Sequence, residues 1–139
     1  MSNEVKLDEF RIFTNNPVKI EDKVIKIDSA REGKEFPHAC NFTIHKITSS
    51  RDDKIKVEFD IQMTFDPDGS RLKIFLDANE WKNYEFVKLL KSVKYKEWGN
   101  INMKFEDEKL KGKHVMELIF NTFHGDDPYK IQIRDLKIG

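Results

Sequence analysis

The stretch from Lys54 to Thr64 alternates apolar and polar residues over its whole length. Its apolar positions are Ile55, Val57, Phe59, Ile61 and Met63. Charged or polar residues stand between them. A β-strand turns successive side chains to opposite faces, so one parity is buried while the other meets water. Five apolar matches in a row therefore predict a β-strand with one apolar and one polar face.

Shorter alternations of the same kind recur along the chain, and turns rich in Gly, Pro, Asn and Asp separate them. Besides 54–64, we expect strands in 23–28, 41–47, 71–77, 101–105 and twice within 113–139, with a few strand-like positions before residue 14. Turns are expected at 15–17, 49–53 and 66–70. The strand at 71–77 is expected to return from its turn as the partner of 54–64.

The last strand changes its apolar parity between Ile133 and Leu136. A strand keeps one face apolar only by holding a period of two, so this switch predicts a β-bulge near Arg134 and Asp135.

The stretch 80–95 fits two structures. Trp81, Tyr84, Val87 and Leu90 make a helical stripe, whereas 84–87 and 91–95 also fit strands. We expect a strand here, because one more strand continues the series on either side. A short helical turn is allowed at 78–83, and Trp81 is placed in a loop.

The composition limits what the chain can be. With 139 residues there is room for one compact domain, and 11 Phe point to a large core. The 25 basic and 25 acidic residues cancel, so nothing draws the whole molecule to nucleic acid or to an anionic membrane. The single cysteine, Cys40, excludes an internal disulfide and is expected to be a buried thiol.

The N-terminus does not resemble a secretory signal, and no apolar run is long enough to cross a bilayer. We expect either a cytoplasmic protein or a domain excised from a secreted one.

These patterns together predict an all-β fold. About eight to ten short antiparallel strands, without an internal repeat or a linker, indicate a single β-sandwich domain over 1–139. A jelly roll, with its strands in two sheets, suits this length.

Three segments resemble the jelly-roll carbohydrate-binding modules attached to xylanases and other glycanases, within the galactose-binding-like superfamily. These segments are KIKVEFDIQM followed by RLKIFLD, then KYKEWGNINMKFE, and finally HVMELIFNTFHGDDPYKIQIRDLKI. The resemblance implies non-catalytic binding of a polysaccharide or oligosaccharide. It also implies a structural calcium ion. Asp135 matches the second Asp of the family's closing strand, while Arg134 stands at the position where the family usually has its first Asp. The alternative for Asp135 is a solvated bulge residue.

Catalytic motifs are missing from the sequence. No Ser or Cys lies in a nucleophile elbow, and none of the four His pairs with another His or Cys at metal-ligand spacing. Asp66 to Gly69 has some calcium-loop character, but Arg71 occupies the sixth position where an EF-hand needs Gly, so a β-turn is expected. With 25 acidic residues, paired carboxylates are not specific evidence for a glycosidase. We expect no enzyme activity.

Sugar-binding sites usually place a flat aromatic side chain against the pyranose ring and planar polar groups that form hydrogen bonds with the hydroxyls. Trp81 and Tyr84, in the polar stretch ANEWKNYEF, are the candidate platforms. Their alternative role is packing over a sheet edge.

The candidate hydroxyl partners are Asp60 and Gln62 on the polar parity of 54–64, and Arg71 on the strand that follows. His38, in the loop with Phe36 and Pro37, is a further candidate. The alternative for the polar parity is an ordinary wet sheet face. Trp98 is expected to anchor the core at a strand entry.

The leading hypothesis is therefore non-catalytic glycan binding. A protein-interaction domain on the same fold is the first alternative, and a small β-sandwich enzyme acting on carbohydrate is the second. A sandwich hosts many functions, so the fold alone does not decide between them.

Overall fold

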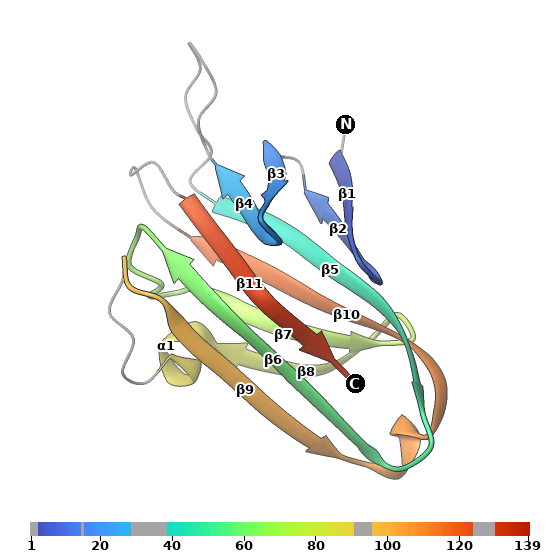
Figure 1. The fold of residues 1–139 in the computed structure, drawn as a ribbon. Coiled ribbons are helices and arrows are strands. Elements are labelled where there is room, and N and C mark those ends of the chain that lie inside the picture. Colours follow the sequence, from blue (N-terminus) through green and yellow to red (C-terminus); the bar gives the residue numbers. More distant parts are fainter. Residues whose placement is uncertain (1–2, 15, 29–38, 91–95, 124–129) are drawn as a thin grey trace.

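The structure is a computed structural model that describes residues 3–14, 16–28, 39–90, 96–123 and 130–139. Two antiparallel sheets lie face to face (Figure 1), which confirms the predicted all-β sandwich. Sheet A has the order β1 (Asn3–Leu7), β2 (Phe10–Thr14), β5 (Ala39–Ser50), β10 (Gly112–Phe123), β7 (Arg71–Leu76) and β8 (Asn79–Glu85). Sheet B has the order β3 (Val18–Glu21), β4 (Val24–Asp28), β11 (Lys130–Ile138), β6 (Lys54–Met63) and β9 (Gly99–Glu106).

Two short helical segments complete the described chain, α1 (Phe86–Leu89) and the 3-10 turn η1 (Glu108–Leu110). No helix in these ranges is long and apolar enough to cross a membrane. The six strands of sheet A and five of sheet B exceed the expected eight to ten, because the N-terminal part folds into two hairpins, β1–β2 and β3–β4.

The core lies between the sheets and is rich in Phe. The ring of Phe120 on β10 stacks on Phe42 with a centroid distance of 4.3 Å. It meets Phe59 on β6 edge-on at 5.7 Å, so aromatic contacts join the two sheets. Cys40 is buried, as predicted, and its thiol donates to the Asn16 Oδ1 at 3.3 Å.

The predictions for β6 and β11 are confirmed. All five apolar residues of β6 are buried, and the polar residues between them face outward. In β11 the pairing register with β6 shifts between Arg134 and Lys137. Asp135 has a φ of 53° at this point, so the parity switch in the sequence does mark a bulge.

The predicted pairing of β6 with β7 is wrong, because β6 belongs to sheet B and β7 to sheet A. The turn between them does form: the Ser70 N–H donates to the Pro67 carbonyl at 2.9 Å. However, Phe65 and Ser70 on either side of the turn are both buried. The connection therefore crosses from one sheet to the other instead of returning along the same one.

The strand prediction for the ambiguous stretch 80–95 is right up to Glu85 and wrong for Phe86–Leu89, which form the helical turn α1. Trp81 lies within β8, where the pairing with β7 shifts register, and not in a loop. The helical turn is α1, which follows β8 instead of occupying 78–83. Phe86 is fully buried and fixes this turn against the core. Residues 91–95 of the prediction lie outside the described residues.

Candidate functional site

The outward surface of sheet B carries planar polar side chains from three neighbouring strands. β6 pairs with β11 on one side and with β9 on the other. The register sets Gln62 beside Gln132 and Asp60 between Arg134 and Asn100. We call these five residues, together with Trp98 immediately before β9, the polar face.

One end of the polar face is an amide pair. The Gln132 Nε2 donates to the Gln62 Oε1 at 2.7 Å. The Gln62 Nε2 in turn donates to the Lys96 carbonyl at 2.9 Å. These bonds fix the orientation of both amides, so their remaining donors and acceptors point in defined directions.

At the centre of the polar face, Asp60 accepts a hydrogen bond on each carboxylate oxygen. The Arg134 Nε donates to its Oδ2 at 3.2 Å, and the Asn100 Nδ2 donates to its Oδ1 at 3.0 Å. Asn100 also reaches the Glu58 Oε2 at 3.4 Å. A hydrogen-bonded row of planar groups thus runs across three strands.

Trp98 supplies an aromatic ring beside this row. The Arg134 guanidinium lies over the indole at 3.9 Å from the ring centroid. Trp98 is half-buried, and the hydrophobic core does not include it. The prediction that Trp98 anchors the core is therefore wrong; its side chain packs under a polar group of the sheet surface.

Glu58 lies next along β6 and is ionised at neutral pH. The Lys56 ammonium approaches its carboxylate at 3.3 Å. This contact, with a smaller contribution from Asn100, holds the pKa of Glu58 below its ordinary value. A carboxylate of this kind accepts hydrogen bonds from a ligand but does not readily donate a proton.

Arg71 lies far from this set, on the outward surface of sheet A. Its Nε donates to the Asn83 Oδ1 at 2.7 Å. Its guanidinium also approaches Glu85 at 3.9 Å. Since Asp60 and Gln62 face outward from the other sheet, the structure does not bring the three predicted hydroxyl partners together.

Trp81 is half-buried on β8, the edge strand of sheet A. Its ring packs against Phe105 of sheet B with centroids 5.0 Å apart. The ammonium groups of Lys82 and Lys109 lie 4.9 and 5.2 Å from the ring centroid. Trp81 thus closes an edge of the sandwich, and cations cover its ring.

Tyr84 is also packed against the core from β8. Burial raises the pKa of its phenol. Trp81 and Tyr84 therefore do not lie on the same surface as Asp60 and Gln62. His38 lies outside the described residues.

The surroundings of Asp135 do not fit a calcium site. Its carboxylate is exposed, and the Arg134 guanidinium lies at 4.0 Å. Across the described ranges, no three His, Cys, Asp or Glu side chains converge as metal ligands would. A calcium ion at Asp135 stays an untested implication of the sequence resemblance.

Sequence reasoning found Asp60 and Gln62 but missed Trp98, Asn100, Gln132 and Arg134. The available signal was parity, because the outward positions of 99–106 and 130–134 are polar like those of β6. Parity does not give the order of the strands in the sheet, and only that order places the outward residues of β6, β9 and β11 side by side.

No protein-family model matches the chain, and no curated protein matches it. Solved structures do match it over most of its length. TmCBM61 in complex with β-1,4-galactotriose gives a TM-score of 0.56 at 11% identity, covering 94% of this chain and 87% of that one. A structure from a study of CBM4 gives 0.53 at 15% identity, covering 91% and 78%.

A third match is the enzymatically active domain of bacteriophage CBA120 tailspike protein 4, with a TM-score of 0.51 at 15% identity. It covers all of this chain but 19% of the tailspike chain. Identities this low carry information on the fold alone. The chain has the jelly-roll β-sandwich of carbohydrate-binding modules, in agreement with the resemblance of its sequence.

Proposed function

We propose that the protein binds a glycan, without catalysis, on the polar face of sheet B. The observation that carries this proposal is two adjacent hydrogen-bonded groups, the Gln132–Gln62 pair and the Arg134–Asp60–Asn100 row, with an indole beside them. Sugar hydroxyls need planar donors and acceptors in fixed directions, and the apolar face of a pyranose needs an aromatic surface. Both kinds of group lie on one outward surface, where the Arg134 guanidinium covers one face of the Trp98 indole and a sugar would have to use the exposed part of the ring.

The row also limits the energy lost on binding. Asp60 is held by two hydrogen bonds, and Gln62 by two more. Side chains that are already oriented lose little conformational freedom when a ligand arrives. On an open sheet surface we expect affinities on the order of micromolar to millimolar.

The structural neighbours support a carbohydrate ligand. TmCBM61 was solved with a galactose trisaccharide, and it shares this fold over nearly the whole chain. The tailspike neighbour includes an enzymatically active domain, so the neighbours do not decide between binding and catalysis. The charges of the carboxylates on the polar side of β6 bear on that question.

Glu58 and Asp60 lie on the same face of β6 and are bridged by Asn100. Two such carboxylates could in principle cleave a glycosidic bond. A glycosidase needs one of them protonated at working pH, with a raised pKa. Lys56 instead lowers the pKa of Glu58, and Arg134 pairs with Asp60. This arrangement favours binding over acid catalysis.

A panel of soluble xylans, glucans, mannans and galactans, followed by intrinsic Trp fluorescence and calorimetry, tests the proposal. We expect a bound glycan to shift the emission, and Gln62→Ala and Asn100→Ala to weaken binding about tenfold, as for a lost pair of hydrogen bonds. Both residues are surface side chains, so thermal melts should stay unchanged. No response from any glycan in the panel would remove the proposal.

Two tryptophan variants separate the polar face from the platform expected from sequence. Trp98→Ala should abolish binding if the polar face is the site. Trp81→Ala should leave binding intact but lower stability, because Trp81 packs against Phe105. The opposite result would place the ligand at the sandwich edge beside Trp81.

A protein partner is the second candidate, favoured by the outward surface of sheet A. Ile47 is 53% exposed there, and its cross-strand neighbour Val115 extends the apolar surface. Contiguous exposed apolar side chains mark interaction surfaces. Loss of a partner in pull-downs with Ile47→Ser, with glycan binding unchanged, would support this function.

A further inference from the structure

A groove of about 670 Å³ opens at the end of the sandwich where β5 gives way to β6. Residues 49–52 and 54 at the junction of β5 and β6, the end of β9, and Gly139, which follows β11, line it. Ile55 and Phe105, both buried, contribute apolar surface to its wall. Because an apolar wall lowers the local dielectric constant, charges in this groove act more strongly than on open surface.

Cations outnumber carboxylates along the groove. Its basic side chains are Arg51, Lys54, Lys56 and Lys104, and its acidic side chains are Asp52 and Glu106.

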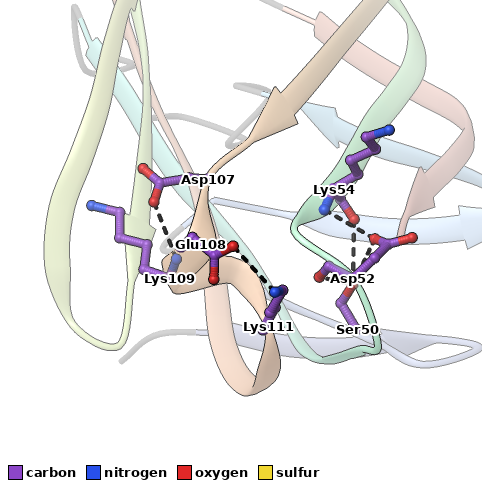
Figure 2. A network of polar contacts seen from close by, with 7 residues as sticks. All are labelled: Ser50, Asp52, Lys54, Asp107, Glu108, Lys109 and Lys111. Atoms are coloured by element: carbon purple, nitrogen blue, oxygen red, sulfur yellow. Dashed lines mark hydrogen bonds and ion pairs between the residues drawn. The ribbon is translucent and has the colours of Figure 1, made fainter.

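The Asp52 carboxylate is occupied by its own turn. Its Oδ1 accepts from the backbone N–H of Lys54 at 3.0 Å and from the Ser50 Oγ at 3.4 Å. Figure 2 shows these contacts, with the Lys54 side chain extending away from the turn. Among the described residues, the Lys54 ammonium forms no ion pair with Asp52 or with any other carboxylate.

The other carboxylate does not neutralise the cations either. Glu106 is the cross-strand neighbour of Lys54, but within the described residues the two side chains form no ion pair.

Lys56 and Lys104 lie directly opposite each other on β6 and β9. Like charges at such positions destabilise a sheet. Glu58 offsets Lys56 at 3.3 Å, whereas Lys104 makes no ion pair with any residue that the structure describes. An anion bound between the two strands would relieve this repulsion.

The groove and the polar face lie along the same strand, β6. Lys56, Glu58, Asp60 and Gln62 point outward from the same strand at every second position. At about 3.3 Å per residue, Lys56 lies about 13 Å from Asp60 along β6. An oligosaccharide of a few rings can span both.

We propose that the groove binds the anionic group, carboxylate or sulfate, of an acidic glycan whose neutral part lies on the polar face. This inference rests on the proposed glycan-binding function and narrows its ligand class. Lys54 and Lys104 would bind the anion directly, and Lys56 would share it with Glu58.

The test compares each acidic ligand with its neutral counterpart by calorimetry. Oligogalacturonate and its methyl ester form one pair, and dextran sulfate and dextran form the other. We expect one acidic member to bind about tenfold more tightly than its neutral partner at about 0.1 M salt, and this advantage to shrink at about 1 M, where charges are screened. The pair that shows the advantage identifies carboxylate or sulfate as the ligand group.

Lys54→Gln and Lys104→Gln should remove most of the advantage without changing the affinity for the neutral ligand. Lys113→Gln is the matched control, since Lys113 is exposed on β10 and does not line the groove. Equal binding of acidic and neutral ligands, or equal effects of all three variants, would overturn the inference while leaving neutral glycan binding intact.

Failure of the proposed function gives a different pattern. Acidic ligands would then bind and respond to Lys54→Gln and Lys104→Gln, but Gln62→Ala and Asn100→Ala would have no effect. That outcome would support the anion site and remove the polar face as a glycan surface. If no ligand of either pair binds, the inference is overturned as well.

Discussion

His114 joins the turn between β7 and β8 to the start of β10. Its Nδ1 lies 2.6 Å from the Asp77 Oδ2, and its Nε2 lies 2.8 Å from the Lys111 carbonyl. Both partners are acceptors, so the arrangement is satisfied when both ring nitrogens carry protons. The Asp77 carboxylate and the Lys111 carbonyl raise the pKa of His114, and His114 lowers the pKa of Asp77.

This contact predicts a pH window of stability. Because its pKa is raised, His114 contributes fully to the free energy of unfolding below its ordinary pKa of about 6.5. This contribution is lost as the pH rises through the pKa of His114 in the folded state. The Asp77 contribution is complete above about 3.9 and is lost as the pH falls through its lowered pKa. Denaturant melts should therefore show the largest benefit between about pH 4 and 6.5.

Asp77→Asn is a matched variant, because its amide oxygen can still accept from the Val115 N–H as the Asp77 Oδ1 does at 2.9 Å. In this variant an NMR titration should return the pKa of His114 toward its ordinary value, and the pH window should flatten. An unchanged pKa of His114 would show that Asp77 does not hold the imidazolium.

For single residues, the sequence predicted which side chains face water but not which side chains contact each other. The alternation of β6 predicted that Asp60 and Gln62 face water. It could not show that Arg134, more than 70 positions later in the chain, donates to Asp60. Trp98 was assigned to the core because tryptophans usually pack there. Its real neighbour, the Arg134 guanidinium, comes from a strand whose place in the sheet is set by the whole fold.

At the scale of elements, the hairpin between β7 and β8 turns through an alanine, which is unusual at such a position. Asp77 and Ala78 have φ values of 50° and 66°, which is the pattern of a type I′ turn. An alanine with a positive φ costs about 1 kcal/mol or more, because its Cβ crowds the backbone. Glycine has no such cost, and its greater freedom in the unfolded chain offsets only part of the gain.

Ala78→Gly should therefore raise the free energy of unfolding by about 0.5–1 kcal/mol in denaturant melts. Gly69→Ala is the matched opposite. Gly69 has a φ of 82°, and a Cβ there would meet nothing within 4 Å. Gly69→Ala should lower the free energy of unfolding by about 1 kcal/mol, and backbone strain alone would account for that loss. Changes of the same sign in both variants would contradict the assignment of strain to these turns.

Element types were easier to predict from sequence than their pairing. Apolar alternation identified β6, and the parity switch identified the bulge in β11. The tight turn at 66–70 was also recognised, yet a turn of this kind serves a hairpin and a crossing equally well. Only the burial of Phe65 and Ser70 on its two sides shows that the chain passes between sheets.

At the scale of the whole molecule, the aromatic residues hold the two layers together. The composition predicted a large Phe core, and Phe120 is its centre. Besides Phe42 and Phe59, it contacts Phe86 of α1 with centroids 5.9 Å apart. One side chain thus joins sheet A, sheet B and the helical turn after β8, so its loss should affect the domain as a unit.

Phe120→Ala should lower the free energy of unfolding by about 3–5 kcal/mol. An ordinary domain has a free energy of unfolding of about 5–15 kcal/mol, and the expected loss is a large part of it. Phe120→Leu, for which a smaller loss in the same direction is expected, replaces the alanine variant if that variant does not fold.

Phe123→Ala is the matched control on the same strand. Phe123 is 53% exposed, and its backbone N–H donates to the Ser70 Oγ whatever its side chain, so a change within about 0.5 kcal/mol is expected. Denaturant melts of both variants measure the difference. Equal losses would mean that the interlayer contacts of Phe120 contribute no more than a surface side chain, and the layers would then be joined mainly through the aliphatic residues around it.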